Sequence, residues 1–312
     1  MMLRNRTDAY PTSLPKISSI IPTYNSEKTI KKCLTSILSQ DYPDLEVLIV
    51  DGGSKDKTID ICKNFPVKII SLQKNIVGFS RQIGVDESTG DVCAFIDSDV
   101  VLPSETWLSR IVRHFYDDAP FPIAGVFSLG LYEKKLPAHN RLMIVTGPKN
   151  PPKIVSIKDY FPVGTGHTII LKNVIHKVGG FRKDLRRGQD FELTDRILRA
   201  GYCFIYAEDL KSYHLYADSW LNLIKKMLRT YKIEVMQGYP KNPSLSPKNI
   251  MLDLMLIPSF YKALLGFKKD RDWVWLLLPF AHFIRALVVS YYRIVFRKHR
   301  TQSSIDKKSD HS

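Results

Sequence analysis

The chain has 312 residues, of which 44% are hydrophobic and 25% charged, an ordinary balance for a globular protein. It is long enough for one large domain or two small ones, and its composition excludes a collagenous or largely disordered protein. The formal net charge of +15 points to an anionic partner, such as nucleic acid, a membrane surface or a phosphorylated substrate, although a basic chain can also simply be soluble.

The cysteines do not indicate a disulfide framework or a zinc site. Cys33, Cys62, Cys93 and Cys203 lie among apolar neighbours, and no two of them form a C-x-x-C pair. We expect reduced, buried thiols, which fits a cytoplasmic compartment. Residues 1–16 are polar, hold two prolines and lack the apolar segment of a secretory signal, so we expect a flexible tail there.

Between residues 17 and 96, short apolar runs alternate with amphipathic segments. The apolar runs predict buried strands, and the segments between them place apolar residues at helical spacing. Such alternation is typical of an α/β fold with a mostly parallel central sheet flanked by helices. The expected strands are 17–22, 45–50, 67–72 and 91–96, and the expected helices are 25–40, 54–65 and 76–90, the last irregular at Gly78 and Gly84.

Polar stretches follow three of these strands at the point where each strand ends. They are PTYN (22–25), DGGS (51–54) and DSD (97–99). Ligands of parallel α/β sheets bind at the carboxyl ends of the strands. Because three polar stretches converge on one edge, we expect a binding site there.

The alternation weakens after residue 120. We expect a strand within 121–132, a break at 149–153, and a glycine-containing turn into a strand over 161–173. A helix is expected over 188–202, with Gly201 as its stop.

Asp97 and Asp99 carry like charges that repel unless a positive group lies between them. The pair is compatible with a solvated turn, a calcium loop or a metal–diphosphate site. An EF-hand loop needs further oxygen ligands, an internal glycine and a closing glutamate, a set that VVLPSE does not supply. A Mg²⁺ or Mn²⁺ ion shared between carboxylates and substrate phosphates needs only this pair, and the strand context favours it.

Asp51 opens the DGGS stretch. A simple Gly-Gly turn explains the stretch, and so does a carboxylate that accepts hydrogen bonds from a nucleobase while the glycines allow close approach. The sequence has no G-x-G-x-x-G after the first strand and no G-x-x-x-x-G-K-[ST]. These absences argue against a dinucleotide dehydrogenase and a P-loop NTPase.

The stretch SSIIPTYNSEKTIKKCLTSILSQDYPDLEVLIVDGGSKDKT resembles the opening of the inverting glycosyltransferases of family 2, and later motifs follow in the family's order. The resemblance runs from about residue 17 to 220. It implies a GT-A-like fold and an enzyme that transfers a sugar with inversion from a UDP- or GDP-sugar to an acceptor hydroxyl. It also implies a Mg²⁺ or Mn²⁺ cofactor.

The resemblance assigns the donor-binding residues. Pro22, Thr23 and Tyr24 would line the nucleotide pocket, and Asp51 would contact the base. Arg81, in NIVGFSRQIG, would lie near the nucleotide or its phosphates.

The resemblance also assigns the reacting part of the site. Asp97 would contact the ribose or the donor sugar and Asp99 would hold the metal, with His214 in SYHLYADS near the metal or diphosphate. Asp190 in GQD matches the acidic catalytic position, where it would act as general base. An acid favoured by a helix dipole is the plainer explanation for Asp190.

Two positions depart from the family's pattern. Gly52 replaces the second of two aspartates before G-S, and Gln189 replaces the glutamate of a Glu–Asp pair. The Q-x-x-R-W motif of processive polysaccharide synthases is absent, which favours an enzyme that adds a single sugar.

Other charged residues near the motifs have plainer explanations. We interpret His167 as structural, because a lone histidine is more often structural than catalytic. We expect Glu192 and Asp195 to pair with local cations such as Arg196 and Arg199.

The C-terminal third combines basic and apolar residues. The segment 273–296 is long enough to span a bilayer, but Pro279, His282 and Arg285 lie near its middle; the segment 250–267 holds Asp253, Pro258 and Lys262. In-plane or re-entrant helices therefore fit better than clean spans, and buried helices of a soluble protein stay possible. The basic residues of the preceding segment form either a solvated helix face or a surface for anionic lipid headgroups: Lys225, Lys226, Arg229 and Lys232. The residues expected to anchor the apolar helices in lipid are Trp273, Trp275, Tyr291 and Tyr292, and RKHR (297–300) would add attraction to anionic lipid.

We therefore expect a metal-dependent glycosyltransferase on the cytoplasmic face of the membrane, with a lipid-linked or glycan acceptor. A polyprenyl-phosphate sugar synthase and a non-catalytic nucleotide-sugar-binding membrane protein are the alternatives. No recognition helix, zinc motif or aromatic RNA-binding motif supports a nucleic-acid partner. The expected regions are a flexible tail (1–16), a nucleotide-sugar-binding half (17–130), an acceptor or catalytic half (131–220), a membrane-associated helical region (221–300) and a polar tail (301–312).

Overall fold

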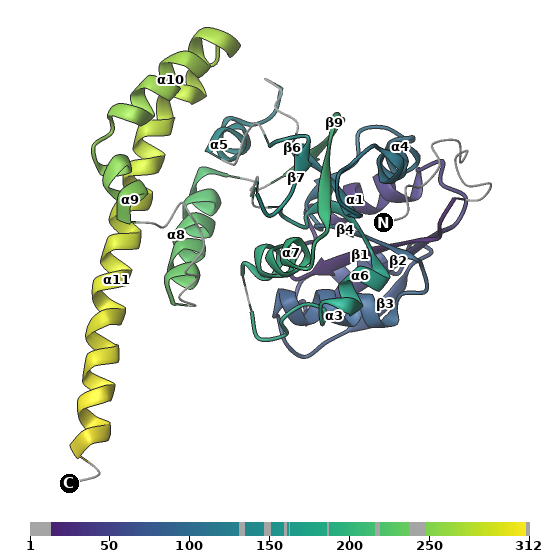
Figure 1. Ribbon diagram of the computed structural model, residues 1–312, viewed down its shortest axis with the longest axis horizontal. Helices are drawn as coiled ribbons and strands as arrows, with labels where there is room; N and C mark the ends of the chain where they lie inside the picture. Colours follow the sequence, from purple (N-terminus) through teal and green to yellow (C-terminus); the bar gives the residue numbers. More distant parts are fainter. Residues whose placement is uncertain are drawn as a thin grey trace. The chain divides into compact units, whose positions relative to one another are not determined.

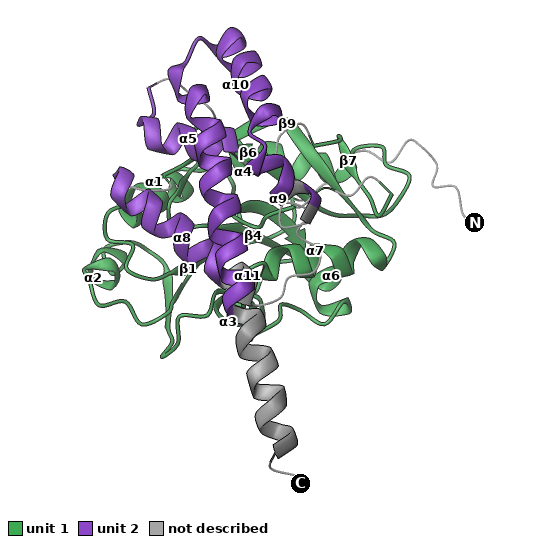
Figure 2. Cartoon of the chain, turned by 90° about the vertical axis from the view of Figure 1, so that its left-hand side faces the viewer, with its two compact units in different colours: residues 1–131, 148–215 green, residues 132–147, 216–312 purple. Residues whose placement is uncertain are grey.

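The chain forms two compact units, which we call the sheet unit and the helical unit (Figure 2). The sheet unit comprises residues 1–131 and 148–215, and the helical unit comprises residues 132–147 and 216–312. The expected boundaries at residues 130 and 220 stay a prediction. Most of the expected tail 1–16 lies outside the described residues, whereas the expected tail 301–312 is helical as far as Ser309. The computed structural model describes residues 14–130, 135–146, 151–158, 161, 163–185, 187–215, 219–236 and 247–309.

A nine-stranded sheet dominates the described part of the sheet unit, with strand order β3-β2-β1-β4-β8-β6-β9-β5 and β7 paired with β9 (Figure 1). The strands β3-β2-β1-β4 are parallel, as the alternating sequence predicts. The strands are β1 (Ile17–Thr23), β2 (Leu45–Asp51), β3 (Lys68–Ser71), β4 (Val92–Ile96), β5 (Val100–Val101), β6 (Ile123–Gly130), β7 (Ile154–Val155), β8 (His167–Leu171) and β9 (Cys203–His214).

The sheet is mixed beyond β4. Strand β8 runs antiparallel to both β4 and β6, while β6 and β9 are parallel. Short strands β5 and β7 pair antiparallel with β9. The α/β prediction is confirmed, and the parallel arrangement holds for the half of the sheet that the strand–helix alternation encodes.

Both faces of the sheet are buried, which explains why the strands read as continuous apolar runs. In β4, Ala94 faces one hydrophobic core while Cys93 and Phe95 face the other. All four cysteines are free and buried as expected, and burial raises the pKa of the Cys93 thiol to about 12. The helices of this unit are α1 (Ile30–Leu38), α2 (Thr58–Cys62), α3 (Val77–Glu87), α4 (Trp107–Arg113), the 3₁₀ turn η1 (His114–Tyr116), α6 (Lys172–Lys177) and α7 (Gln189–Arg199).

Helix α3 runs unbroken through Gly78 and Gly84, so the predicted irregularity there is wrong. The glycines serve close packing instead. A Cβ on Gly84 would lie 2.3 Å from the Ile20 side chain, and one on Gly78 would lie 2.2 Å from the backbone oxygen of Arg182. The glycines thus let α3 approach both the sheet and the segment that precedes α7.

Gly78→Ala should lower the free energy of unfolding by about 1–3 kcal/mol, because the added methyl meets a backbone carbonyl that cannot rotate away. Urea denaturation of the purified chain measures this change. Gly164→Ala is the matched control, since its added Cβ would lie 3.6 Å from the nearest atom, an ordinary contact. Equal stability of the two variants would contradict the prediction.

The helical unit contains one stretch, among the described residues, that is long and apolar enough to cross a membrane: Trp273–Val295, of which 33% is buried. The expected apolar segment 250–267 is broken at Leu256, whose φ of 59° separates two helices. Trp275 is buried against Gly266 and donates to Asp270 at 2.8 Å, so its expected contact with lipid is wrong. The helices are α5 (Ala138–Thr146), α8 (Trp220–Met236), α9 (Pro247–Leu254), α10 (Ile257–Asp270), the 3₁₀ turn η3 (Trp273–Leu277) and α11 (Leu278–Ser309).

Candidate active site

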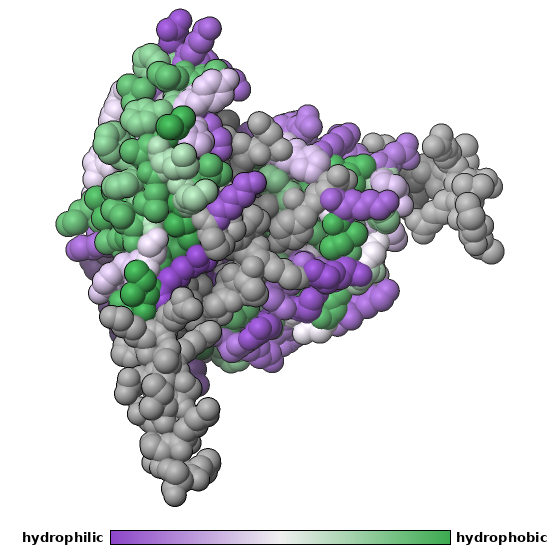
Figure 3. Space-filling view, turned by 60° about the vertical axis from the view of Figure 1, so that its left-hand side comes forward, coloured by the Kyte–Doolittle hydropathy of each residue, from purple (hydrophilic) through white to green (hydrophobic). Residues whose placement is uncertain are grey.

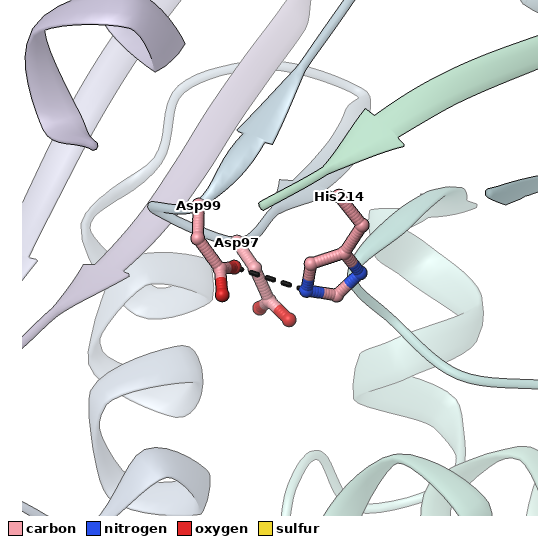
Figure 4. Close-up of side chains that lie close together, drawn as sticks. All are labelled: Asp97, Asp99 and His214. Atoms are coloured by element: carbon pink, nitrogen blue, oxygen red, sulfur yellow. Dashed lines mark ion pairs between the residues drawn. The ribbon is translucent and has the colours of Figure 1, made fainter. Parts of the chain in front are cut away.

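Three side chains converge where β4, β5 and β9 meet. Asp97 follows the last residue of β4, and Asp99 directly precedes β5. Strand β5 pairs antiparallel with the end of β9, so that Val100 lies opposite His214. The ligand atoms of Asp97, Asp99 and His214 all lie within 4.8 Å of one another (Figure 4).

Each carboxylate of this cluster has a nitrogen partner. Nε2 of His214 lies 3.0 Å from Oδ1 of Asp99, and the guanidinium of Arg81 donates to Oδ1 of Asp97 at 2.8 Å. Arg81 comes from α3 and is 3% exposed, and its Nε has no hydrogen-bond partner among the described residues. The positive group that the two aspartates require is therefore partly supplied by the protein.

The donor set of the cluster suits a divalent cation. Carboxylate oxygens are the ligands that Mg²⁺ and Mn²⁺ prefer, and an imidazole nitrogen is acceptable to Mn²⁺. Asp97, Asp99 and His214 are half-buried, which leaves room for substrate oxygens to complete the coordination shell. The three residues assigned to the metal by resemblance thus lie together.

A glycine-containing loop, residues 163–166, lies between this cluster and Asp190. The backbone N–H of Asp97 donates to the carbonyl of Gly166 at 3.0 Å, and a Cβ on Gly166 would lie 2.9 Å from Oδ2 of Asp97. A Cβ on Gly164 would lie 3.6 Å from Oδ2 of Asp190. One short loop therefore touches both the cation cluster and the candidate base. In the sequence, these glycines indicate only a turn.

Gly166→Ala should weaken divalent-cation affinity about 10–100-fold, because the new methyl displaces the Asp97 carboxylate that Arg81 holds. Titration of Mn²⁺ by calorimetry or by its effect on turnover measures the change. Gly164→Ala makes the same chemical change two residues earlier with only an ordinary contact, and its affinity should equal that of the wild type. A wild-type affinity in Gly166→Ala would show that the cluster tolerates the displacement.

Asp190 lies in the first turn of α7, where the helix dipole favours a negative charge. Gly188 precedes the helix with a φ of 69°, and Oδ1 of Asp190 accepts from the N–H of Phe191 at 3.0 Å. The carboxylate is half-buried. The preceding Gln189 is 5% exposed, and its Oε1 has no hydrogen-bond partner among the described residues. An ionised carboxylate in this position can accept a proton from a bound hydroxyl.

Asp51 is buried at the end of β2, and its carboxylate is fully used within the chain. It accepts from the N–H of Gly53 and of Ser54, both at 2.9 Å, and from the hydroxyls of Ser54 at 2.5 Å and Thr23 at 3.2 Å. A carboxylate has about four such acceptor positions. Contact with a nucleobase would therefore replace one of these bonds.

The neighbours of Asp51 complete this edge of the sheet. Thr23 is buried opposite Asp51, because β1 and β2 end in register, and Tyr24 is 41% exposed. Pro22 directly precedes Thr23 in β1 and is half-buried. A Cβ on Gly52 would lie 3.0 Å from the Cα of Asn75, so the departure from the family's second aspartate has a steric reason.

His167 lies beside the cation cluster, with its ring 6.3 Å from the ring of His214. Its Nδ1 lies 3.2 Å from the hydroxyl of Ser128. Burial, and next the nearby His214, lower the pKa of His167 to about 4, so its ring is neutral near pH 7. A neutral, hydrogen-bonded ring fits the structural interpretation of this histidine.

The acidic residues farther along α7 pair locally, as expected. Glu192 pairs with Arg196 at 2.7 Å, and Asp195 pairs with Arg199 at 2.9 Å. These ion pairs distinguish Glu192 and Asp195 from Asp190, which forms no ion pair with the described residues.

Comparison with known proteins identifies the family. The family described as Glycosyl transferase family 2 matches residues 18–178. Glycosyltransferase AglE of Haloferax volcanii is 31% identical over 232 residues, which cover 72% of this chain and 74% of the relative. The chain belongs to glycosyltransferase family 2. It is therefore a transferase enzyme, and the resemblance in the sequence is confirmed.

Solved structures agree with the GT-A fold of this family 2 glycosyltransferase. The mannosyltransferase PcManGT from Pyrobaculum calidifontis, in complex with GDP-Man and Mn²⁺, has a TM-score of 0.62 and 16% identity, covering 91% of this chain and 88% of that one. A segment of TarS from S. aureus in complex with UDP has a TM-score of 0.54 and 19% identity, covering 92% of each chain. At these identities the likeness shows the fold alone.

Proposed function

We propose that this glycosyltransferase transfers a single sugar, with inversion, from a UDP- or GDP-sugar to an acceptor hydroxyl. The observation that carries the proposal is the cluster of Asp97, Asp99 and His214 next to the loop 163–166, whose other end touches Asp190. The two solved relatives bind GDP-Man with Mn²⁺ and UDP, which supports a nucleoside diphosphate leaving group here.

The cation cluster would serve the leaving group. Asp99 and Asp97, together with His214, would hold Mg²⁺ or Mn²⁺, which supplies Lewis-acid stabilisation of the charge on the departing diphosphate. Arg81 would keep Asp97 in place through its 2.8 Å bond. Pro22, Thr23 and Tyr24 would line the nucleotide pocket.

Asp190 would act on the acceptor. The attacking hydroxyl must lose its proton as it bonds to the anomeric carbon, and the carboxylate of Asp190 would accept that proton. Attack on the side opposite the diphosphate inverts the anomeric centre, so one displacement suffices and no covalent intermediate on the enzyme is needed. Asp51 would support the nucleotide pocket by shaping the loop that follows β2.

The acceptor would be a lipid-linked glycan or a growing polysaccharide at the cytoplasmic face of the membrane. The apolar and basic helical unit supports this location, because such an acceptor is presented at a bilayer surface. A polyprenyl phosphate is the alternative acceptor. Its phosphate oxygen carries no proton to remove, so Asp190 would matter little in that case.

A donor screen tests the proposal. Purified enzyme is incubated with UDP- and GDP-sugars and with membrane-extracted glycolipids, in Mn²⁺, in Mg²⁺ or in EDTA, and the release of UDP or GDP is measured. We expect release with at least one donor that depends on both the cation and the acceptor. Equal release in EDTA, or none with any donor, would contradict the proposed reaction.

A further inference from the structure

The helical unit carries its apolar side chains outside. On α11, Phe280, Ile284, Leu287, Tyr291 and Ile294 are between 46% and 61% exposed. They recur every three or four residues and so form one stripe along the helix. Figure 3 shows hydrophobic side chains gathered in one broad area on the face of the helical unit turned to the viewer. An amphipathic helix of a water-soluble domain instead buries its apolar stripe against the core and exposes its polar face.

Helix α10 has a second apolar stripe. Ile257, Phe260, Tyr261, Leu264 and Leu265 are exposed at the same helical spacing. Helices α10 and α11 pack against each other. Monomeric soluble proteins seldom expose apolar patches beyond a few hundred Å², and larger patches mark a partner or a membrane.

Several charged side chains of the helical unit are turned inward and paired. Arg285 of α11 donates to Asp253 of α9 at 3.0 Å, with the His282 ring 3.7 Å from the same carboxylate. Arg141 of α5 pairs with Asp272 at 2.7 Å, and Asp272 is 4% exposed. The central arginine that counts against a clean membrane span in the sequence is thus neutralised inside the unit.

Helix α8 gives the unit a basic side. Lys225, Arg229 and Lys232 are exposed at helical spacing, and α8 packs along α11. The ammonium group of Lys232 lies 5.8 Å from the centre of the Tyr292 ring, near one end of the α11 stripe. Near the other end, the exposed cations Lys268 and Lys269 precede Trp273. Cations beside aromatic rings are typical of a lipid headgroup region.

We propose that the helical unit docks on an anionic lipid bilayer, with α10 and α11 lying in the plane of one leaflet rather than across the membrane. The inference rests on the proposed function in one respect, the location of the enzyme at a membrane. It adds the lipid class and the depth of insertion.

The geometry favours an in-plane position over a span. Helix α10 has 14 residues and is about 21 Å long, shorter than the roughly 30 Å of hydrocarbon in a bilayer. If α11 crossed the membrane, α8 would carry Lys225, Arg229 and Lys232 into the hydrocarbon beside it, where cations are unfavourable. The basic side also disfavours a second copy of the chain as occupant, because lysines are depleted in protein interfaces and two such surfaces repel.

Depth measurement on the full chain tests the proposal. Nitroxide labels are attached to Phe280→Cys, Leu287→Cys and Ile294→Cys in vesicles of phosphatidylcholine with phosphatidylglycerol; the four native cysteines are buried and should not react. Residues 280 and 294 are about 21 Å apart along the helix axis. An in-plane helix gives three equal depths within a few Å, with a label at Lys225→Cys in water. Depths that differ by more than about 10 Å would show a span and overturn the proposal.

Measurement of binding to vesicles is a second test of the docking proposal. Leu264→Asp with Leu287→Asp should weaken binding to anionic vesicles at least about tenfold, since each change puts a charge in the apolar face. Ile157→Asp makes the same kind of change at an exposed apolar residue of the sheet unit and should bind like the wild type. Unchanged binding of the double variant, or loss of a dimer in place of lipid binding, would overturn the proposal.

A soluble readout separates this inference from the proposed reaction. Circular dichroism confirms that each variant is folded, and UDP or GDP release from the donor is measured without vesicles, in the presence of a detergent-solubilised glycolipid acceptor. Normal release with altered lipid binding supports the docking surface. Absence of release in every variant and in the wild type would count against the proposed reaction and leave the depth measurement decisive for docking.

Discussion

Asp99→Asn should lower the rate of sugar transfer by at least about 10³-fold at saturating donor. The asparagine keeps the shape of the side chain but removes the charge that would hold the cation, and cation stabilisation of a leaving diphosphate is worth several kcal/mol, of which about 1.4 corresponds to each tenfold change in rate. Initial rates of UDP or GDP release across a Mn²⁺ titration measure the effect.

Asp91→Asn is the matched control for Asp99→Asn. It makes the same chemical change directly before β4, at the end of the strand opposite the cluster, where the side chain is exposed. The control should transfer sugar at the wild-type rate. A variant at position 99 that reaches the wild-type rate at any Mn²⁺ concentration would remove Asp99 from the catalytic role.

Asp190→Asn should reduce transfer to a hydroxyl acceptor by about 10²–10⁴-fold, the usual contribution of a general base. Donor affinity should change little, because the residue lies on the side of the loop 163–166 away from the cation cluster. Single-turnover transfer measures the first quantity, and calorimetry with the nucleoside diphosphate measures the second.

Asp195→Asn is the control on the same helix, where the carboxylate pairs with Arg199 rather than facing the loop. It should leave transfer close to the wild-type rate. If Asp190→Asn transfers sugar normally, the residue is not the base, and an acceptor phosphate becomes the better interpretation. If both variants lose donor affinity, the effect belongs to the fold of α7 instead.

The first half of the sheet, strands β1 to β4, could be predicted because each of its strands and helices has a recognisable pattern in its own stretch of sequence. Strands β1, β2 and β4 are largely buried and read as continuous apolar runs, while the edge strand β3 is partly exposed. Each of these strands is joined to the next along the chain by a helix. The rule that ligands bind at the carboxyl ends of parallel strands then placed Asp51 and Asp97 at one edge. The structure has both residues there.

The second half could not be predicted in the same way, since its pairings join segments far apart in the chain. The contact between Asp99 and His214 depends on β5, a strand of 2 residues that carries no periodic pattern. The approach of Gly164 to Asp190 depends on where α7 packs, which no local signal encodes. For these residues only the family resemblance connected the motifs.

The helical unit shows a different limit of prediction. Its segments are apolar on average, which suggested lipid contact for Trp273 and Trp275 alike. The structure buries Trp275 against Gly266, because a glycine at that position leaves room for an indole ring, and leaves Trp273 52% exposed. Composition identifies such a region, and packing decides which face of it meets the surroundings.

The saturated carboxylate of Asp51 has a consequence for redesign of the nucleotide preference. The carboxylate of Asp51 accepts four hydrogen bonds, three from its own loop and one from Thr23, so its role is structural. Replacing Asp51 would disrupt this edge of the sheet and would not simply change the nucleotide preference. Discrimination between uracil and guanine would then depend on other groups at this edge of the sheet, such as the exposed side chain of Tyr24. A changed donor preference is therefore better sought by substituting Tyr24 than by substituting Asp51.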